Sequence, residues 1–333
     1  MEIPGNDTLP HGIIPSLPTP FDQDCSIDLD GLTALVEHQI RAGVHGLAVL
    51  CAMGEVQYLL REERGPIIET VVKAAGGKVP VLVGLNAAST RQAIMQGTEA
   101  GELGATGLLV STASAHKIPL PTLMAHFRAI AVETGLPMIL DRSSALARLH
   151  ASDDEVGRLL DSAGFKGLRE ARSRPLQDLK VHAKRSDRIL LYVGNYTLLP
   201  DAMALGAAGT ICPVLSLFPE EAVTMYDAAR EGDNIVAHQL ATQLAPIMLA
   251  LFGKRFNQTI TRHLLSVVRA GMPIPRVNEP VMSAIKYGLA LRGVPITPRV
   301  RKPLPEVNAR QRARIRAELL RLGLIKEDVP QYA

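Results

Sequence analysis

Short apolar runs alternate with amphipathic segments along the first two thirds of the chain. Four Gly-x-x-Gly pairs each follow a segment whose apolar residues have helical spacing and precede a short apolar run. A glycine suits the end of a helix, and an unbroken apolar run is typical of a buried parallel strand. Each pair therefore marks a helix-to-strand junction. The pairs begin at Gly43, Gly104, Gly164 and Gly206.

The spacing of these junctions predicts a repeated βα unit. The first three pairs lie about 60 residues apart, the length of two βα units of about 30 residues each. Eight alternating units by Pro213 predict a closed (β/α)8 TIM barrel. The alternative is an open doubly wound sheet, but no GxGxxG or GxxxxGK[ST] motif follows the first strand, which disfavours its nucleotide-binding form. Intervening strands are expected at Gly12–Leu17, Val79–Gly84, Met138–Asp141 and Ile189–Gly194, and helices at Asp28–Ala42, Glu62–Ala75, Thr90–Leu103, Thr122–Glu133, Asp153–Asp161 and Pro219–Glu231.

The pattern changes after Glu231. Helical periodicity continues without a strand signal, which predicts a helical region over residues 232–333 packed on a barrel of residues 1–231. The tail is a basic amphipathic segment, and we interpret its charges as a solvated face. The expected helices are Ile235–Leu251, Thr259–Ala270, Pro280–Arg292 and Arg310–Gly323.

Composition excludes several classes of protein. The 333 residues carry 36 basic and 33 acidic side chains, a balance that disfavours nucleic acid or a membrane surface as partner. Charge or proline interrupts every apolar stretch before the roughly 18 residues that a membrane helix needs, and no signal peptide is seen. Cys25, Cys51 and Cys212 lack metal or disulfide spacing, so we expect a cytoplasmic protein with no metal and no cofactor.

Two charged residues stand where chemistry is expected. Active sites of such barrels lie at the carboxyl ends of the strands, where the fifth strand ends in Asp141 and the sixth in Arg169. If Arg169 points inward, strand alternation puts Gly167 and Phe165 on the same face. Neighbouring strands lie about 4.8 Å apart, so Asp141 and Arg169 are plausible partners. The pair either grips an anionic substrate or merely plugs the barrel mouth.

Several segments in order resemble the dihydrodipicolinate synthase / N-acetylneuraminate lyase family. The resemblance covers nearly the whole chain, and it implies a lyase barrel that assembles as a homo-oligomer, a dimer or tetramer. The matching segments are GIIPSLPTPF (12–21), GLAVLCAMGEVQYLLREER (46–64), PVLVGLNAAST (80–90), GATGLLVS (104–111), KGLRE (166–170) and VRKPLPEV (300–307).

The resemblance also implies a set of site residues, from which this sequence departs. Family members form a Schiff base between a sixth-strand lysine and pyruvate or another 2-oxo acid, assisted by two tyrosines and a hydroxyl pair. Here the lysine position is Arg169, the tyrosine positions are Asp141 and Ala115, and the hydroxyl pair is Ala52-Met53. The family's carboxylate-binding arginine falls near Leu146, with Arg142 or Arg148 as substitutes.

Arginine at the lysine position changes the expected chemistry. An amine that forms an imine must lose its proton, and a guanidinium with a pKa above about 12 does not. Arg169 instead offers a planar fork suited to a carboxylate. Lys166 has the wrong strand parity to replace it, and Lys286 resembles a structural lysine of the family.

Three functions follow as hypotheses. The first is a divergent lyase-superfamily enzyme that binds a small 2-oxo or hydroxy carboxylic acid without a Schiff base. The second is a catalytically inactive barrel that binds a ligand, and the third is a conventional synthase-like lyase. The candidate catalytic residues are Arg169 and Asp141, and the candidate substrate-binding residues are Ala52, Met53, Gly194 and Ile211. Weaker candidates have simpler interpretations: His116 as a solvated loop residue, Cys51 as a small buried one, and Glu55 as a cap of the next helix.

Overall fold

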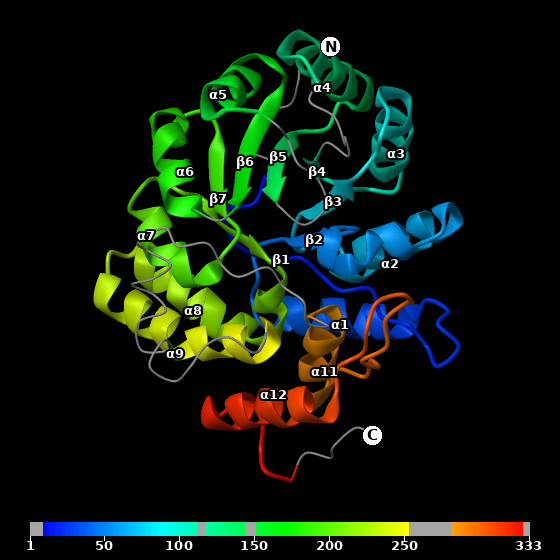
Figure 1. The fold of residues 1–333 in the computed structure, drawn as a ribbon, viewed down its shortest axis with the longest axis vertical. Coiled ribbons are helices and arrows are strands. Elements are labelled where there is room, and N and C mark those ends of the chain that lie inside the picture. Colours follow the sequence, from blue (N-terminus) through cyan, green and yellow to red (C-terminus); the bar gives the residue numbers. More distant parts are fainter. Residues whose placement is uncertain (1–8, 112–117, 144–150, 173, 253–280, 329–333) are drawn as a thin grey trace.

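Eight parallel strands form a ring with helices around it (Figure 1). The computed structural model describes residues 9–111, 118–143, 151–172, 174–252 and 281–328. The strands are β1 (Gly12–Pro15), β2 (Leu47–Val49), β3 (Val81–Leu85), β4 (Gly107–Val110), β5 (Met138–Ser143), β6 (Phe165–Ala171), β7 (Leu190–Val193) and β8 (Gly209–Cys212).

The sheet closes on itself between β1 and its two neighbours. The strand order is β1-β8-β7-β6-β5-β4-β3-β2, and β1 pairs with β8 from Gly12↔Gly209 to Pro15↔Cys212. On the other side a parallel bridge joins Ser16 to Ala48. The prediction of a (β/α)8 barrel is therefore confirmed.

The six barrel helices that the sequence predicts lie close to their expected positions, and α6 and α7 are additional. Side chains mark several starts: Ser152 and Glu155 form a reciprocal capping box at α5, and Asp28 accepts a bond from the backbone of Gly31 at α1. The helices are α1 (Leu29–Arg41), α2 (Arg64–Ala75), α3 (Thr90–Glu102), α4 (Leu120–Thr134), α5 (Asp153–Ser162), α6 (Pro175–His182), α7 (Leu199–Met203) and α8 (Pro219–Arg230).

The barrel interior is a small apolar cluster, separate from the larger core between strands and helices. Its largest member is Tyr192, whose hydroxyl donates to the Pro10 carbonyl at 2.9 Å, toward the amino-terminal end of the strands. The interior is thus packed and is no pore. Its buried members are Leu9, Ile14, Ala48, Leu82, Leu109, Ile139, Leu190, Tyr192, Ala208 and Ile211.

The expectation that Phe165 faces the interior is wrong. The β5–β6 register shifts between Met138 and Ile139, because Met138 pairs with Phe165 whereas Ile139 pairs with Gly167. The extra residue is a β-bulge, which reverses the alternation before it. Phe165 consequently packs against Phe127 of α4, with ring centroids 4.9 Å apart. From Gly167 onward, the predicted alternation of inward and outward side chains holds.

Helices after the barrel pack on one side of it (Figure 1): α9 (Asn234–Phe252), α11 (Val281–Leu291) and α12 (Ala309–Arg321). The expected helix Thr259–Ala270 lies outside the described residues. By length and composition alone α9 is able to cross a membrane, so the expectation that charge or proline interrupts every apolar stretch is wrong there: the helix continues through Pro246. Its buried face packs against α8 and α12.

The β1–β8 seam depends on a glycine. A Cβ at Gly209 would lie 2.1 Å from the backbone oxygen of Gly12, so Gly209→Ala should separate the strands and cost about 2–3 kcal/mol of unfolding free energy. Denaturant unfolding measures this loss. Gly101→Ala is the matched control, because a Cβ there meets Leu136 at an ordinary 3.4 Å and alanine favours the helix. Equal stabilities of the two variants would contradict the argument.

Candidate functional site

A ring of side chains lies directly above the apolar interior, at the carboxyl ends of the strands. Strand alternation places these residues two positions beyond an interior residue: Ser16 after Ile14, for example, and Asp141 after Ile139. Cys51 joins them from the bend after β2, where it packs against the interior cluster. We call this set the floor layer; its members are Ser16, Cys51, Gly84, Ser111, Asp141, Arg169 and Gly194.

Asp141 and Arg169 form an ion pair in the floor layer. They are direct partners in the β5–β6 ladder, and Nη1 of Arg169 donates to Oδ1 of Asp141 at 2.7 Å. Their side chains are 11% and 12% exposed, so the pair is largely shielded from water without being sealed. The described residues supply no further partner for Nη2 of Arg169 or Oδ2 of Asp141. As far as the described part of the chain goes, one donor edge and one acceptor oxygen are therefore open to a ligand.

Arg169 also reaches across β7 to β8. Its Nε donates to the Ile211 carbonyl at 2.8 Å. That carbonyl is available because the β7–β8 ladder ends at Val193↔Thr210. Gly194 follows β7, and a Cβ there would lie 2.3 Å from the Cβ of Ala171, so the position has no room for a side chain. The guanidinium is thus held between the Asp141 carboxylate of β5 and the Ile211 carbonyl of β8.

The predicted substrate-binding residues divide into two groups. Ala52 and Met53 are partly exposed in the turn after β2. Ile211 is fully buried within the interior, and its carbonyl is already bonded to Arg169. Gly194 lies in the floor layer. Ser16 and Ser111 were not among the predicted site residues, although counting two positions on from Ile14 and Leu109 reveals them.

Charge in the floor layer is concentrated on the ion pair. Burial by itself would lower the pKa of Arg169, but the Asp141 carboxylate outweighs it and raises the pKa above its usual value. Burial raises the pKa of the Cys51 thiol to about 11 and also raises the pKa of Cys212. Both thiols therefore stay protonated at neutral pH, and Cys51 is no thiolate nucleophile.

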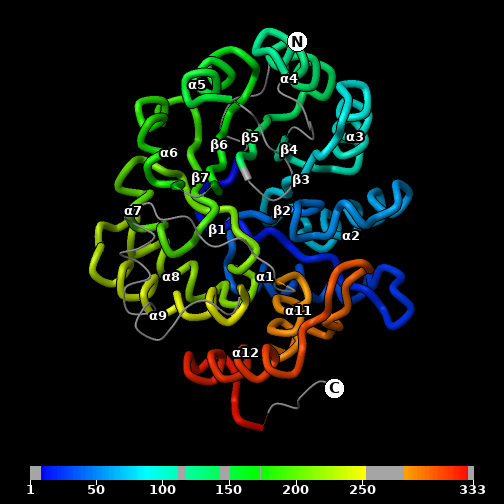
Figure 2. The backbone as a smooth tube through the Cα atoms, viewed as in Figure 1, coloured from blue at the N-terminus to red at the C-terminus, as the bar shows by residue number. Residues whose placement is uncertain are grey.

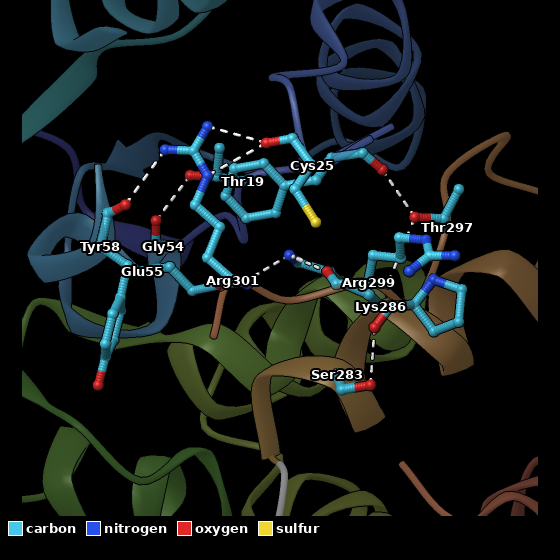
Figure 3. A network of polar contacts seen from close by, with 12 residues as sticks. Thr19, Cys25, Gly54, Glu55, Tyr58, Ser283, Lys286, Thr297, Arg299 and Arg301 are labelled. Atoms are coloured by element: carbon cyan, nitrogen blue, oxygen red, sulfur yellow. Dashed lines mark hydrogen bonds and ion pairs between the residues drawn. The ribbon is translucent and has the colours of Figure 1, made fainter. Parts of the chain in front are cut away.

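The turn that carries Ala52 and Met53 is held by a buried carboxylate. Glu55 has a left-handed backbone (φ 59°), and its fully buried side chain binds Nζ of Lys286 and the backbone N–H of Arg301 (Figure 3). Burial lowers the pKa of Lys286 to about 8, although Glu55 opposes that shift. The expectation that Glu55 caps the next helix is wrong, because the backbone turns left-handed at Glu55 and points its carboxylate into the protein.

Arg301 extends this contact to the first loop of the barrel. Its guanidinium donates to the carbonyls of Cys25 and Tyr58 (Figure 3). It also pairs with Glu63, and it lies 4.7 Å from the centroid of the Phe21 ring. The tube in Figure 2 shows the segment after α11 returning to the loop before α1. The carboxyl-terminal region therefore positions the loops of β1 and β2 at the site.

A second set of ion pairs lies behind the first, on the outer face of β5 and β6. Arg142 pairs with Glu170 and Asp153, each at 3.0 Å, and Arg172 also contacts both carboxylates. The Arg142 side chain is 1% exposed and faces the helices, so it does not replace a carboxylate-binding arginine at the mouth. The other loop candidates, His116, Ala115, Leu146 and Arg148, lie outside the described residues.

Comparisons with known proteins agree with one another. The dihydrodipicolinate synthetase family model matches residues 9–268. A 4-hydroxy-tetrahydrodipicolinate synthase of Methanosphaerula palustris is 31% identical over 306 residues, which cover 91% of this chain and 96% of the relative. An uncharacterized DapA-like lyase of Halobacterium salinarum is 27% identical over 95% of both chains.

Solved structures give the same result. A prophage protein of the dihydrodipicolinic acid synthase family from E. coli K12, solved in complex with pyruvate, superposes with a TM-score of 0.78. It is 25% identical, and the match covers 94% of this chain and 99% of that one. A further dihydrodipicolinate synthase structure is 27% identical with a TM-score of 0.78.

Removing one partner of the Asp141–Arg169 ion pair should lower the unfolding free energy more than replacing both partners by apolar residues. Asp141→Asn leaves the Arg169 charge without its carboxylate and should lower the unfolding free energy by about 3–5 kcal/mol. Asp141→Leu/Arg169→Met replaces both charges by apolar groups and should recover most of that loss. Denaturant unfolding of both variants tests the pairing. A double variant no more stable than Asp141→Asn would contradict it.

His182 behind the outer ion pairs should make the protein sensitive to acid. Burial, together with the charge of Arg142, lowers its pKa from 6.5 to about 4. As the pH falls from 6.5 toward 4 the unfolded chain protonates this histidine first, so folding stability decreases in that window. Allowing for screening, the loss is about 2–3 kcal/mol. His182→Gln should lose less stability than the parent between pH 7 and 4.5 in urea unfolding, and parallel losses would refute the assignment.

Proposed function

The chain belongs to the dihydrodipicolinate synthetase family, and on that premise we propose that it binds a small 2-oxo or 2-hydroxy carboxylic acid and acts without a lysine Schiff base. Arg169 stands at the lysine position of the family in this proposal, and Asp141 at a tyrosine position. The reaction class is a lyase, hydratase or isomerase step without a covalent imine. Cytoplasmic location and a homo-oligomeric state remain predictions.

The observation that carries the proposal is the placement of Arg169. Its guanidinium faces the barrel mouth from the carboxyl end of β6 and keeps one donor edge free of described partners. Because the Asp141 carboxylate raises the pKa of Arg169 despite its burial, the group stays charged and is no nucleophile toward a carbonyl carbon. A charged planar fork at this position suits the carboxylate of a small acid.

Asp141 has two roles in this proposal. In the free protein it orients and neutralises Arg169 through the 2.7 Å bond. Once a substrate carboxylate shares the guanidinium, Asp141 is the charged base of the floor layer nearest to that substrate. Proton abstraction beside a carbonyl or hydroxyl carbon is then the step for which it is placed. Ala52 and Met53 would cover the apolar side of the ligand from the β2 turn.

A second candidate function is ligand binding without catalysis. The observation that favours it is the closed geometry of the ion pair, which leaves Asp141 neutralised in the free protein. Among the described members of the floor layer, the other titratable group is Cys51, whose thiol is protonated at neutral pH because burial raises its pKa to about 11. A barrel with this floor would retain the ligand without an efficient proton acceptor.

Borohydride trapping tests the absence of the Schiff base. After incubation with pyruvate and sodium borohydride, the intact mass should be unchanged, because no amine in the floor layer is available for imine formation. The Methanosphaerula palustris relative, a 4-hydroxy-tetrahydrodipicolinate synthase, is a positive control. Arg169→Lys, which places an amine at the β6 end, is a second comparison. A stable pyruvate adduct on the parent protein would overturn the proposal.

Ligand binding separates the proposed roles of the two charged residues. Small carboxylates such as pyruvate, lactate and propanoate should raise the Tm of the parent, and Arg169→Ala should abolish the shift for all of them. Glu37→Ala, which removes an exposed partner of Arg41 on α1, is a control that should leave the shift intact. A shift that survives Arg169→Ala would remove this residue from the site.

A further inference from the structure

The charges of the floor layer cancel in the ligand-free protein. Arg169 donates through Nη1 to Oδ1 of Asp141 at 2.7 Å, and the two side chains are only 11% and 12% exposed. Cys51 and Cys212 also act on Arg169, but burial raises the pKa of both thiols, so they are uncharged at neutral pH. Within the described part of this layer, one permanent cation is therefore balanced by one carboxylate.

The ion pairs on the outer face of β5 and β6 hold no spare positive charge. His182 faces the same cluster and is uncharged at neutral pH, because burial and the Arg142 charge lower its pKa to about 4. When all groups of the cluster are ionised, two guanidinium groups meet three carboxylates, so the cluster cannot offset a further anion at the mouth. Its members are Arg142, Arg172, Asp153, Glu170 and Asp178.

A ligand carboxylate would bring a second negative charge to the guanidinium of Arg169. Nε and Nη1 are already bonded to the Ile211 carbonyl and to Asp141, so the ligand is left with Nη2 among the nitrogens described. Two carboxylates then share one planar group, and each disfavours the ionised form of the other. Water and salt screen this repulsion weakly, because the pair is largely shielded from solvent. A proton on one carboxylate removes the repulsion.

We propose that binding of a carboxylate to Arg169 is coupled to proton uptake by Asp141, so that the site takes up a small acid together with a proton. The inference rests on the proposed function, which supplies the carboxylate on Arg169. One anion and one proton enter together, so the net charge of the floor layer does not change. The proton comes from solvent, and the O–H bond forms on Oδ2 of Asp141, which has no partner among the described residues.

The same coupling makes the substrate activate its own base. In the free protein the Arg169 charge is devoted to Asp141, which makes this carboxylate a weak proton acceptor. The ligand takes a share of that charge, and Asp141 becomes a stronger base only while the ligand is bound. At neutral pH and above, where solvent protons are scarce, Asp141 stays charged and accepts its proton from the substrate instead.

Titration calorimetry of the full chain with pyruvate tests the coupling between pH 5.5 and 7.5, where the carboxyl of pyruvate stays ionised. The Kd should rise with pH, by up to about tenfold per pH unit where one whole proton is taken up. At pH 6 the observed enthalpy should differ between PIPES and Bis-Tris buffers, because the buffer supplies the proton. A Kd independent of pH with equal enthalpies would overturn the inference and leave the proposed function standing. Absence of binding at every pH would overturn the proposed function itself.

Variants of two titratable residues identify the proton acceptor. Asp141→Asn removes the competing carboxylate, so it should bind pyruvate about ten- to hundredfold more tightly at neutral pH and take up no proton. His182→Gln is the control, and its proton uptake should equal that of the parent. Weaker binding by Asp141→Asn, or loss of the uptake in His182→Gln, would contradict the assignment. If Asp141→Asn does not fold, the buffer comparison on the parent still decides whether a proton is taken up.

Discussion

The Asp141–Arg169 ion pair is the constraint on which the candidate site depends. A guanidinium so close to the barrel interior requires a carboxylate, and the direct pairing of the two residues in the β5–β6 ladder supplies one at 2.7 Å. The early end of the β7–β8 ladder leaves the Ile211 carbonyl for Nε. Together these contacts hold a permanent positive charge at a fixed place in the floor layer, which suits binding of an anion more than attack on a carbonyl carbon.

Two supports outside the barrel keep that floor in place. The outer ion pairs join Arg142 and Arg172 to Glu170 and Asp153, so the same two strand ends are paired on both faces. On the opposite side the carboxyl-terminal region binds the β2 turn through Glu55, Lys286 and Arg301 (Figure 3). The most buried of these contacts, Arg142–Glu170 and Lys286–Glu55, specify geometry at some cost of desolvation. The helical region is thereby part of the site's architecture. Its boundary at residue 231 stays a prediction.

Family membership and chemistry lead to different expectations for this chain. The fold, the lyase family and the pyruvate-bound relative point to 2-oxo acids as ligands of the family. The floor layer has a charged pair in place of an amine, and a guanidinium paired with a carboxylate offers hydrogen bonds but no nucleophile. Our proposal keeps small 2-oxo or 2-hydroxy acids as the ligand class. It replaces the lysine Schiff base by an ionic contact with Arg169.

The sequence by itself determined the barrel, because the period of about 30 residues and the apolar strands are local patterns. They do not depend on which residues pair between neighbouring strands. It also identified Asp141 and Arg169, since both stand at recognisable strand ends. Tertiary structure alone decided two other points. The bulge before Gly167 turned Phe165 outward, since the β5–β6 register is set by pairing and not by periodicity. The role of Glu55 depends on Lys286, a residue more than 200 positions away. Both points depend on contacts between separate segments of the chain, which leave no pattern along the sequence.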